Sequence, residues 1–427
     1  MQLSIPLESL SLLRSSDLMP SQVHTLMDIS CSHACSRNAR VVSSIRQVDA
    51  RAWDRLTRGL GLYAQRGFLE GVERSGAKGI AHRYVVFSQD GETTGVASIR
   101  LARFHGPALQ SLLPESPAAQ LLARAAGVGS GPIAMPVLVC SAGFGCGGTG
   151  VHFSDAVQPW DGLVQLRQAL RRIGADLPRG QRPLGVLMES AKPVDRDLRT
   201  ALDVHGFFAL ETSPRMVLEL DAGWNDFDDY LSSLKSKFRV KAKRAYAKSN
   251  ALEPRVLSVE EIALHLPRMR ELHADVVDQA GFHVSGGNVD SLVTLARGLG
   301  SAMVVQGYFL DGALVGFLTA FEREGVLDAH SVGFDYGLNR GHSIYPRMLY
   351  DYLRIAIERH LGHVDFGRTA QEIKSTLGAV PVPTRSYLRH SNTLINPFLG
   401  LVTRRLEPPT EPQRQPFKAE VIARRAA

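Results

Sequence analysis

The sequence has few cysteines and lacks any apolar run long enough to cross a membrane. Only four of its 427 residues are cysteine: Cys31, Cys35, Cys140 and Cys146. Cys31 and Cys35 flank a histidine, but a closed zinc site needs four ligands and no second ligand pair lies nearby. We therefore expect no metal site, no disulfide framework and no membrane-spanning helix.

The N-terminus also lacks the features of a signal peptide. No basic residue precedes its first apolar stretch, and Glu8 and Asp17 interrupt it. These absences predict a cytoplasmic protein in a reducing compartment. Cys140, which follows the apolar run 134–139, is expected to be a small buried hydrophobic residue.

Basic residues slightly outnumber acidic residues. There are 49 Lys and Arg against 42 Asp and Glu, a net charge of +7. This excess favours an anionic partner, such as a phosphorylated cofactor, RNA or a lipid surface, although many enzymes are equally basic without one. It is far below the charge of a chromatin protein, so we expect no DNA partner. The 44% hydrophobic content is typical of a globular protein with its own core.

Composition and periodicity predict four regions. Residues 1–42 form a poorly ordered leader, and 393–427 a proline-rich, partly disordered tail. Between them lie two domains, 43–210 and 211–392.

The first domain opens with an apolar helical pattern over 50–71 and a hairpin turned by Asp90-Gly91. The glycine-rich segment 141–150 lacks a known nucleotide-binding fingerprint and is expected to line a cleft between the domains. The other expected elements are strands 83–88, 94–104, 133–140, 184–188, 207–210 and 216–220, and helices 160–173 and 194–204.

The second domain follows a similar plan. Residues 226–248 read as one long helix, and Ser258 with Glu261 forms a capping box for a second. Asp311-Gly312 again predicts a hairpin turn. The elements expected after 248 are helices 258–278, 289–299, 344–360 and 370–377, and strands 302–310, 314–322, 326–334, 363–366 and 385–389.

The predicted fold class is therefore α/β (α+β): tandem duplicated domains, each a mixed sheet flanked by helices. The order of elements in the second domain resembles the GNAT plan, and its duplication resembles the FemAB-like aminoacyltransferases and GNAT acetyltransferases of polysaccharide and peptidoglycan pathways. Three segments carry the resemblance: 227–244, 332–346 and 365–379.

The resemblance implies an acyltransferase. Its donor would be an acyl-CoA, and its acceptor an amine or hydroxyl of a small molecule, glycan or peptide in cell-envelope or polysaccharide metabolism. The segment 337–343 has glycines and an arginine, but not the spacing of the acetyl-CoA loop of GNAT enzymes. Two alternatives stay open: a FemAB-like transferase using charged tRNA, and a non-catalytic scaffold.

Five residues are candidates for catalysis. Asp365, at the end of a strand, and His330 are candidate bases, while Lys374 and Arg368 would stabilise negative charge. Tyr345 would protonate a leaving thiolate.

Four of these candidates have an ordinary alternative. Lys374 would be a solvated lysine, Arg368 would pair with Glu372, Tyr345 would pack in the core, and His330 would be structural. By strand alternation, His330 shares a face with Asp328, Val332 and Phe334.

Two basic segments are candidates for binding the donor. The segment before the helix at 344 would bind phosphate through Arg340, Gly341, His342 and Ser343; the alternative is a plain turn with Ser343 as N-cap. The helix at 226–248 carries basic residues around an apolar stripe that includes Phe238 and Ala242. Its charged face would contact CoA phosphates, tRNA or, peripherally, a membrane; alternatively it is simply solvated. The basic residues are Lys237, Arg239, Lys241, Lys243 and Arg244.

Overall fold

A computed structural model describes residues 39–75, 80–105, 135–141, 148–190, 194–279, 283–284, 289–403 and 411–426. Cys31, Cys35 and Cys146 lie outside the described residues, as does most of the glycine-rich segment.

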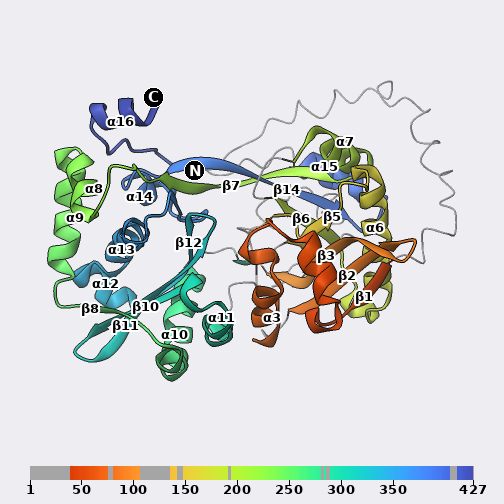
Figure 1. Ribbon diagram of the computed structural model, residues 1–427, viewed down its shortest axis with the longest axis horizontal. Coiled ribbons are helices and arrows are strands. Elements are labelled where there is room, and N and C mark those ends of the chain that lie inside the picture. Colours follow the sequence, from red (N-terminus) through yellow and green to blue (C-terminus); the bar gives the residue numbers. More distant parts are fainter. Residues whose placement is uncertain are drawn as a thin grey trace, which may run out of the picture. The chain divides into compact units, whose positions relative to one another are not determined.

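The described strands join one mixed sheet of 14 strands (Figure 1). They are Ala39–Val42 (β1), Ala81–Gln89 (β2), Glu92–His105 (β3), Met135–Cys140 (β4), Val151–Phe153 (β5), Gly185–Ser190 (β6), Phe208–Glu219 (β7), Glu253–Val256 (β8), His283–Val284 (β9), Met303–Leu310 (β10), Ala313–Arg323 (β11), Val326–Phe334 (β12), His363–Asp365 (β13) and Val380–His390 (β14).

The sheet contains the same strand pattern twice, as the predicted duplication requires. The first half runs β1-β2-β3-β4-β6-β14, and the second runs β8-β10-β11-β12-β13-β7. In each half three antiparallel pairs are followed by one parallel pair, β4 with β6 or β12 with β13. One more antiparallel strand then completes the half.

The completing strands are exchanged between the halves. β7 follows the first half in sequence but pairs with β13, whereas β14 ends the second half and pairs with β6. β7 and β14 also pair with each other, from Phe208 opposite Leu388 to Val217 opposite Val380. The prediction of two separate strands at 207–210 and 216–220 was wrong, because β7 is continuous. It runs across residues 210 and 211 and belongs to both halves.

Helices cover both faces of the sheet. They are Ala50–Leu56 (α2), Arg66–Arg74 (α3), Pro159–Ala175 (α6), Arg196–Val204 (α7), Phe227–Ser233 (α8), Ser236–Lys248 (α9), Val259–Gln279 (α10), Leu292–Leu299 (α11), Tyr336–His342 (α12), Ile344–Glu358 (α13), Gln371–Ser375 (α14), Asn396–Thr403 (α15) and Ala419–Ala426 (α16). Short 3-10 turns lie at Ile45–Gln47 (η3), Leu62–Ala64 (η4), Arg179–Gln181 (η5), Val289–Ser291 (η6) and Gly300–Ala302 (η7). None of these described helices has the length and apolar character of a bilayer span.

Two predicted long helices are interrupted. The helix expected at 50–71 stops after Leu56, and Gly59 and Gly61 take positive φ values before η4. The helix expected at 226–248 divides into α8 and α9, because Leu234 takes an extended conformation and bridges to Phe417.

The predicted turns and cap are confirmed. Asp90-Gly91 and Asp311-Gly312 have positive φ at both residues, as a type I′ turn requires. The Ser258 hydroxyl accepts a hydrogen bond from the Glu261 amide at 3.2 Å, and the Ser258 amide donates to the Glu261 carboxylate at 2.9 Å. Cys140 is fully buried, and burial raises the pKa of its thiol to about 12.

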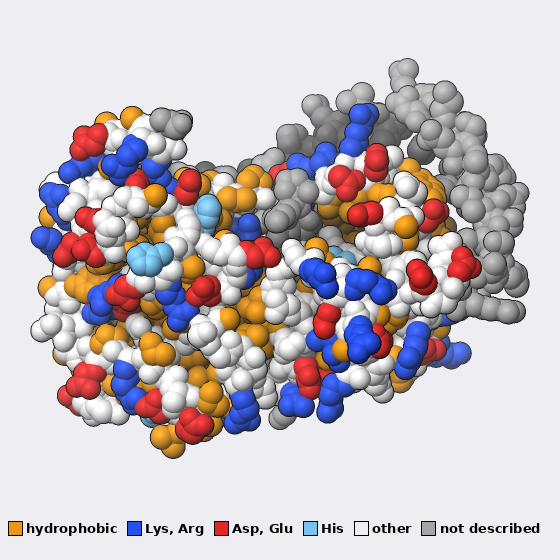
Figure 2. Space-filling view, viewed as in Figure 1, with side chains coloured by type: hydrophobic (Ala, Val, Ile, Leu, Met, Phe, Trp, Pro, Cys, Tyr) orange, Lys and Arg blue, Asp and Glu red, His pale blue; other side chains and the backbone are white. Residues whose placement is uncertain are grey.

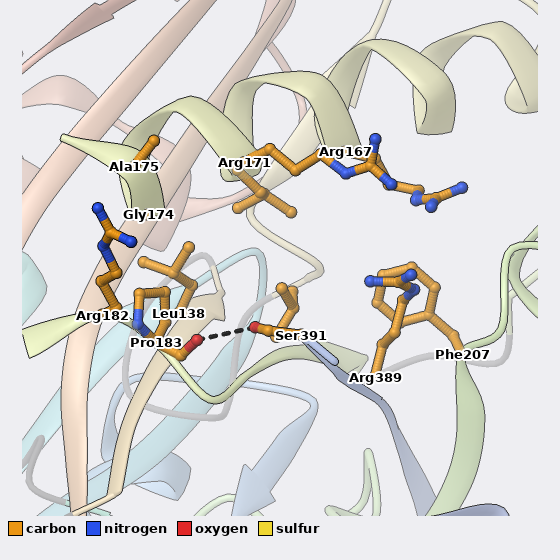
Figure 3. Close-up of a pocket in the computed structure, with 12 residues that line it drawn as sticks. Leu138, Arg167, Arg171, Gly174, Ala175, Arg182, Pro183, Phe207, Arg389 and Ser391 are labelled. Atoms are coloured by element: carbon orange, nitrogen blue, oxygen red, sulfur yellow. Dashed lines mark hydrogen bonds between the residues drawn. The ribbon is translucent and has the colours of Figure 1, made fainter. Parts of the chain in front are cut away.

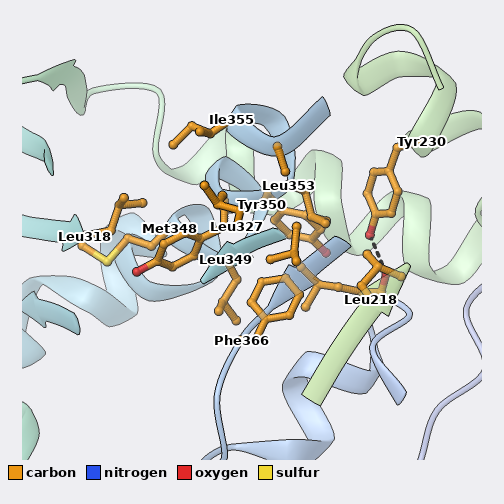
Figure 4. Packing of buried hydrophobic residues seen from close by; sticks show 14 of the residues in the cluster. Leu218, Tyr230, Leu318, Leu327, Met348, Leu349, Tyr350, Leu353, Ile355 and Phe366 are labelled. Atoms are coloured by element: carbon orange, nitrogen blue, oxygen red, sulfur yellow. Dashed lines mark hydrogen bonds between the residues drawn. The ribbon is translucent and has the colours of Figure 1, made fainter. Parts of the chain in front are cut away.

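The two halves share part of their hydrophobic core. One cluster packs α13 against the sheet of the second half, with Leu318, Met348 and Phe366 among its members (Figure 4). A second cluster joins Trp53 and Phe68 of the first half to residues of α10, α11 and β11 in the second. The halves are therefore connected both by exchanged strands and by apolar packing.

We expect Gly378→Ala to lower the free energy of unfolding by about 1–3 kcal/mol. Gly378 has a φ of 103°, and an added Cβ would overlap the ring of Phe417. Gly341→Ala is the matched control, because nothing lies within 4 Å of its Cβ position and its φ is not positive. Urea denaturation of both variants measures the difference. Equal unfolding midpoints would show that Phe417 does not pack on this turn.

Candidate functional site

The site is built where β12 and β13 separate. Their parallel pairing covers Val326 with His363, Leu327 with Val364, and Asp328 with Asp365. β13 then ends, whereas β12 continues to Phe334 with β11 as its partner. The last paired residues are therefore two carboxylates, placed side by side where the sheet opens.

Asp328 is held by a residue from each half of the molecule. The Tyr63 hydroxyl, from η4, donates to its Oδ2 at 2.9 Å. The Arg323 guanidinium also binds Asp328, with Nε on Oδ2 and Nη2 on Oδ1 at 3.1 Å. Asp328 is 1% exposed, and this burial raises the pKa of its carboxyl above the usual value.

Asp365 has a separate set of partners. Arg215 of β7 donates from Nη1 to Asp365 Oδ2 at 2.6 Å, and the Gly367 amide donates to Oδ1 at 3.0 Å. Asp365 is as buried as Asp328, whereas Arg215 Nε is buried without a hydrogen-bond partner among the described residues. The Asp365 charge contributes to the raised pKa of Asp328 after burial, which places the two carboxylates in one electrostatic environment.

We call Tyr63, Arg215, Arg323, Asp328 and Asp365 the carboxylate cluster. Two carboxylates and two guanidiniums balance in formal charge, and all four charged side chains are mostly withdrawn from water. Buried ion pairs cost solvation energy that their attraction offsets only with good geometry. Such an arrangement, with one carboxyl of raised pKa, is typical of sites that transfer protons.

In the sequence, Arg368 and Lys374 follow shortly after Asp365 of the carboxylate cluster. Lys374 is 4% exposed, and its ammonium donates to the Phe366 carbonyl at 2.6 Å. The alternative of a solvated lysine was wrong. Arg368 is half-buried and precedes α14, while Glu372 pairs with Arg414, so the interpretation of Arg368 and Glu372 as neighbours on one helix face was also wrong.

His330 occupies a bulge in β12. Thr319 pairs with Ser331 and Ala320 with Ala329, so His330 has no residue opposite it. The extra residue reverses the alternation: Val332 and Phe334 pack in the cluster with α13, whereas the His330 ring lies edge-to-face on Phe321 of the other cluster. The prediction that His330 shares a face with Val332 and Phe334 was therefore wrong, and of the predicted set only Asp328 lies on its face. Burial lowers the pKa of His330 to about 3, which makes it a weak base at neutral pH.

The segment predicted as a phosphate-binding loop is a helix. Residues 336–342 form α12, so the loop interpretation was wrong. Ser343 is the N-cap residue of α13, as the alternative expected, but its backbone is left-handed and its side chain makes no capping hydrogen bond. The Asp335 carboxylate caps α12 by accepting from the Leu338 amide, and the Asn339 side chain accepts from the Tyr345 amide. Side chains of this protein thus bind amides at the start of both helices. Contacts with phosphate would therefore come from the Arg340 and His342 side chains.

Tyr345 is in the first turn of α13, as predicted. Its ring stacks on Phe334 at 5.4 Å between centroids. Burial raises the pKa of Tyr345 to about 12, so the hydroxyl is a weaker acid than a free tyrosine.

The basic run lies on α9, which packs beside α12 and α13. Ala242 and Ala245 are buried and Phe238 packs against the core, which confirms the apolar stripe. Lys241 donates to the Thr376 hydroxyl at 3.2 Å. Lys237, Lys243 and Arg244 are exposed. Figure 2 shows Lys and Arg side chains interspersed with Asp and Glu over the face in view, so the positive charge is not gathered there.

Sequence reasoning named Asp365 but missed four members of the carboxylate cluster. Tyr63 is 265 positions from Asp328, and Arg215 is 150 from Asp365, so no local spacing connects them. The one available signal was Asp328 itself, an acid inside the apolar strand Val326–Phe334.

The likeness of this chain to known proteins is distant. No protein-family model matches the sequence, and no curated protein does. Among solved structures, FemX is 11% identical, covering 84% of this chain and 100% of FemX with a TM-score of 0.48. A tandem GNAT protein from the clavulanic acid biosynthesis pathway is 13% identical, with coverages of 83% and 99% and a TM-score of 0.46. L-PGS from Bacillus licheniformis is 13% identical, with coverages of 83% and 96% and a TM-score of 0.43. At such identities the chemistry of this chain has to be inferred from its own residues.

Proposed function

We propose that the protein is an N-acyltransferase whose reaction takes place at the carboxylate cluster. The observation that supports this most is the separation of β12 and β13 directly after Asp328 and Asp365. In the GNAT plan that the sequence resembles, the sheet opens to its cleft at this parallel pair. The chain places two buried acids at that point.

The proposed reaction moves an acyl group from a thioester to an amine. The amine nitrogen attacks the carbonyl carbon, a C–N bond forms, and the C–S bond breaks. The proton lost by the amine passes to a carboxylate, and the departing thiolate takes up a proton to leave as a thiol. The raised pKa of Asp328 makes it a better base than an ordinary aspartate, because proton transfer is most efficient when the pKa approaches the working pH. This favours Asp328 over Asp365 and His330, which the sequence suggested.

The other residues have supporting roles in this proposal. Tyr63 and Arg323 orient Asp328, while Arg215 fixes Asp365 and, through it, the Gly367 amide. Arg368 would stabilise the charge that develops on the carbonyl oxygen. Lys374 is a positioning residue, since its ammonium is already bound to the Phe366 carbonyl.

An acyl-CoA is the proposed donor. The basic helix α9 packs against α12, which carries Arg340 and His342, and this places two cationic segments together in the second half. Guanidinium and ammonium groups bind phosphate without needing a helix start. The acceptor would be an amine or hydroxyl of a small molecule, glycan or peptide, with cell-envelope or polysaccharide metabolism as the proposed setting.

The test is a transfer assay on the full chain with a panel of acyl-CoA thioesters and primary amines, read by mass spectrometry. Free CoA and acylated amine should appear in equal amounts. Lys243→Gln/Arg244→Gln should raise KM for the donor with little change in kcat. Transfer only from charged tRNA, with strong salt dependence, would support the aminoacyltransferase alternative. Absence of transfer from every donor would favour the scaffold alternative and contradict the proposal.

A further inference from the structure

A pocket of about 240 Å³ in the first half has an unusual charge (Figure 3). It lies between α6 on one side and β4, β6 and the end of β14 on the other. Four arginines line it: Arg167 and Arg171 from α6, Arg182 from the segment before β6, and Arg389 from β14. No acidic side chain is among the described residues of its lining. None of its lining residues belongs to the carboxylate cluster.

The four guanidiniums are uncompensated within the described part of the chain. None of them forms an ion pair with a described carboxylate. Arg171 and Arg182 are exposed, but Arg167 and Arg389 are partly buried, as is Arg323, which does pair with Asp328. Burial, followed by the charges of Arg389 and Arg171, lowers the pKa of Arg167 to about 10. Like charges gathered in one pocket repel one another, and this repulsion is relieved when an anion binds among them.

Two of the arginines are held in place by the same residue. Arg389 Nε donates to the His205 carbonyl at 3.0 Å, and Arg167 Nη1 contacts the His205 ring nitrogen Nδ1. Burial, with the charges of Arg167 and Arg389, lowers the pKa of His205 to about 4, so the ring is neutral at pH 7 and adds no further charge. Arg167 Nε is buried with no hydrogen-bond partner among the described residues. The pocket therefore holds oriented N–H donors in excess of the acceptors around them.

The dipole of α6 explains only part of this arrangement. Cations are favoured near a helix C-terminus, which accounts for Arg171 in the last two turns of α6. It does not account for Arg182 and Arg389, which come from other segments and line opposite ends of the pocket (Figure 3). The floor is apolar, with Leu138, Leu170 and Phe207, and a floor that excludes water strengthens charge attraction.

We propose that this pocket binds a phosphomonoester or diphosphate group. Neutralising several guanidiniums requires more than one negative charge in a small volume, and tetrahedral phosphate oxygens match the paired N–H groups of arginine. The pocket is smaller than a typical site for a drug-sized ligand, so it accommodates the anionic group itself. This site is independent of the proposed transfer reaction, because it uses none of the residues assigned to that reaction.

The test measures binding of inorganic pyrophosphate to the full chain by calorimetry at constant ionic strength, with sodium chloride as the reference. Binding should be saturable, and Arg167→Met/Arg389→Met should weaken it at least tenfold. Arg51→Met/Arg58→Met, at two exposed arginines, is the matched control and should bind like the unaltered chain. A second arm uses vesicles containing phosphatidic acid, which carry the same phosphomonoester on a lipid.

Each outcome decides the proposal. Loss of pyrophosphate binding in the pocket variant supports a soluble phosphorylated ligand, and loss of vesicle binding alone supports a lipid headgroup. The proposal would be overturned if the pocket variant still bound, or if the unaltered chain bound neither pyrophosphate nor vesicles. Removing two repelling charges should leave the unfolding temperature of the ligand-free variant unchanged or higher. A folded variant is therefore expected, and a clear fall in that temperature would mean that the arginines are structural and would overturn the proposal.

Discussion

Replacing Asp328 with alanine is expected to lower the free energy of unfolding by about 3–5 kcal/mol. The substitution removes the carboxylate that Arg323 binds and leaves that guanidinium, which is 17% exposed, without its partner. It also removes the acceptor of the Tyr63 hydroxyl, which joins the two halves. Urea denaturation followed by circular dichroism measures the loss.

A double substitution separates the charge from the packing. Asp328→Ala/Arg323→Met removes both charges, and it should recover part of the stability that Asp328→Ala loses. Glu211→Ala is the matched control, because its pair with Arg385 is exposed at the surface and such pairs contribute less than about 1 kcal/mol. If Asp328→Ala cost no more than Glu211→Ala, the buried cluster described here would not exist in solution.

Acid should destabilise the protein steeply between pH 6.5 and about pH 4. Burial lowers the pKa of His82 and His152 to about 4 and that of His330 to about 3, from 6.5 in the unfolded chain. Within this window the unfolded state binds protons that the folded state does not, so stability is complete above pH 6.5 and is lost as the pH falls. Each histidine lowers the free energy of unfolding by up to about 1.4 kcal/mol for each pH unit of acidification within this window.

The free energy of unfolding at pH 7, 6 and 5 measures this dependence. His330→Gln should reduce the slope by the share of one histidine, whereas His363→Gln, at an exposed position, should leave it unchanged. A stability that does not change over this range would show that the three rings are accessible to protons in the folded state.

The strands and turns could be predicted from sequence where local chemistry decides them. The Asp-Gly turns, the Ser258 capping box and strand β12 were all read correctly, because each depends on neighbouring residues. The break between α8 and α9 was missed because it depends on Phe417, far along the chain. No pattern around Leu234 predicts that contact.

β7 shows how a local signal can mislead. Pro214 lies in its middle and lacks an amide hydrogen, which favours two short strands. In the structure the proline sits at an irregularity in the pairing of β7 with β14, where Arg215 pairs with Val382 and Thr212 with Thr384. Proline is tolerated at bulges, so the strand continues and links the halves.

The candidate site was predictable only in part for the same reason. Asp365 could be named because it ends a strand, but its neighbours come from β7, β11, β12 and η4. The bulge at His330 also depends on how β11 pairs with β12, and simple alternation wrongly placed Val332 and Phe334 on the same face as that ring. Long-range pairing, rather than composition, assembles the cluster.

The most direct test of the central claim compares kcat for acyl transfer in Asp328→Asn and in Asp54→Asn, an exposed aspartate of α2. Asparagine keeps the shape of the side chain but cannot accept the proton. General-base catalysis typically contributes 100- to 10,000-fold, so kcat of Asp328→Asn should fall by at least about 100-fold while Asp54→Asn stays active. An Asp328→Asn enzyme that is folded and retains full kcat would contradict the assignment of transfer to this cluster.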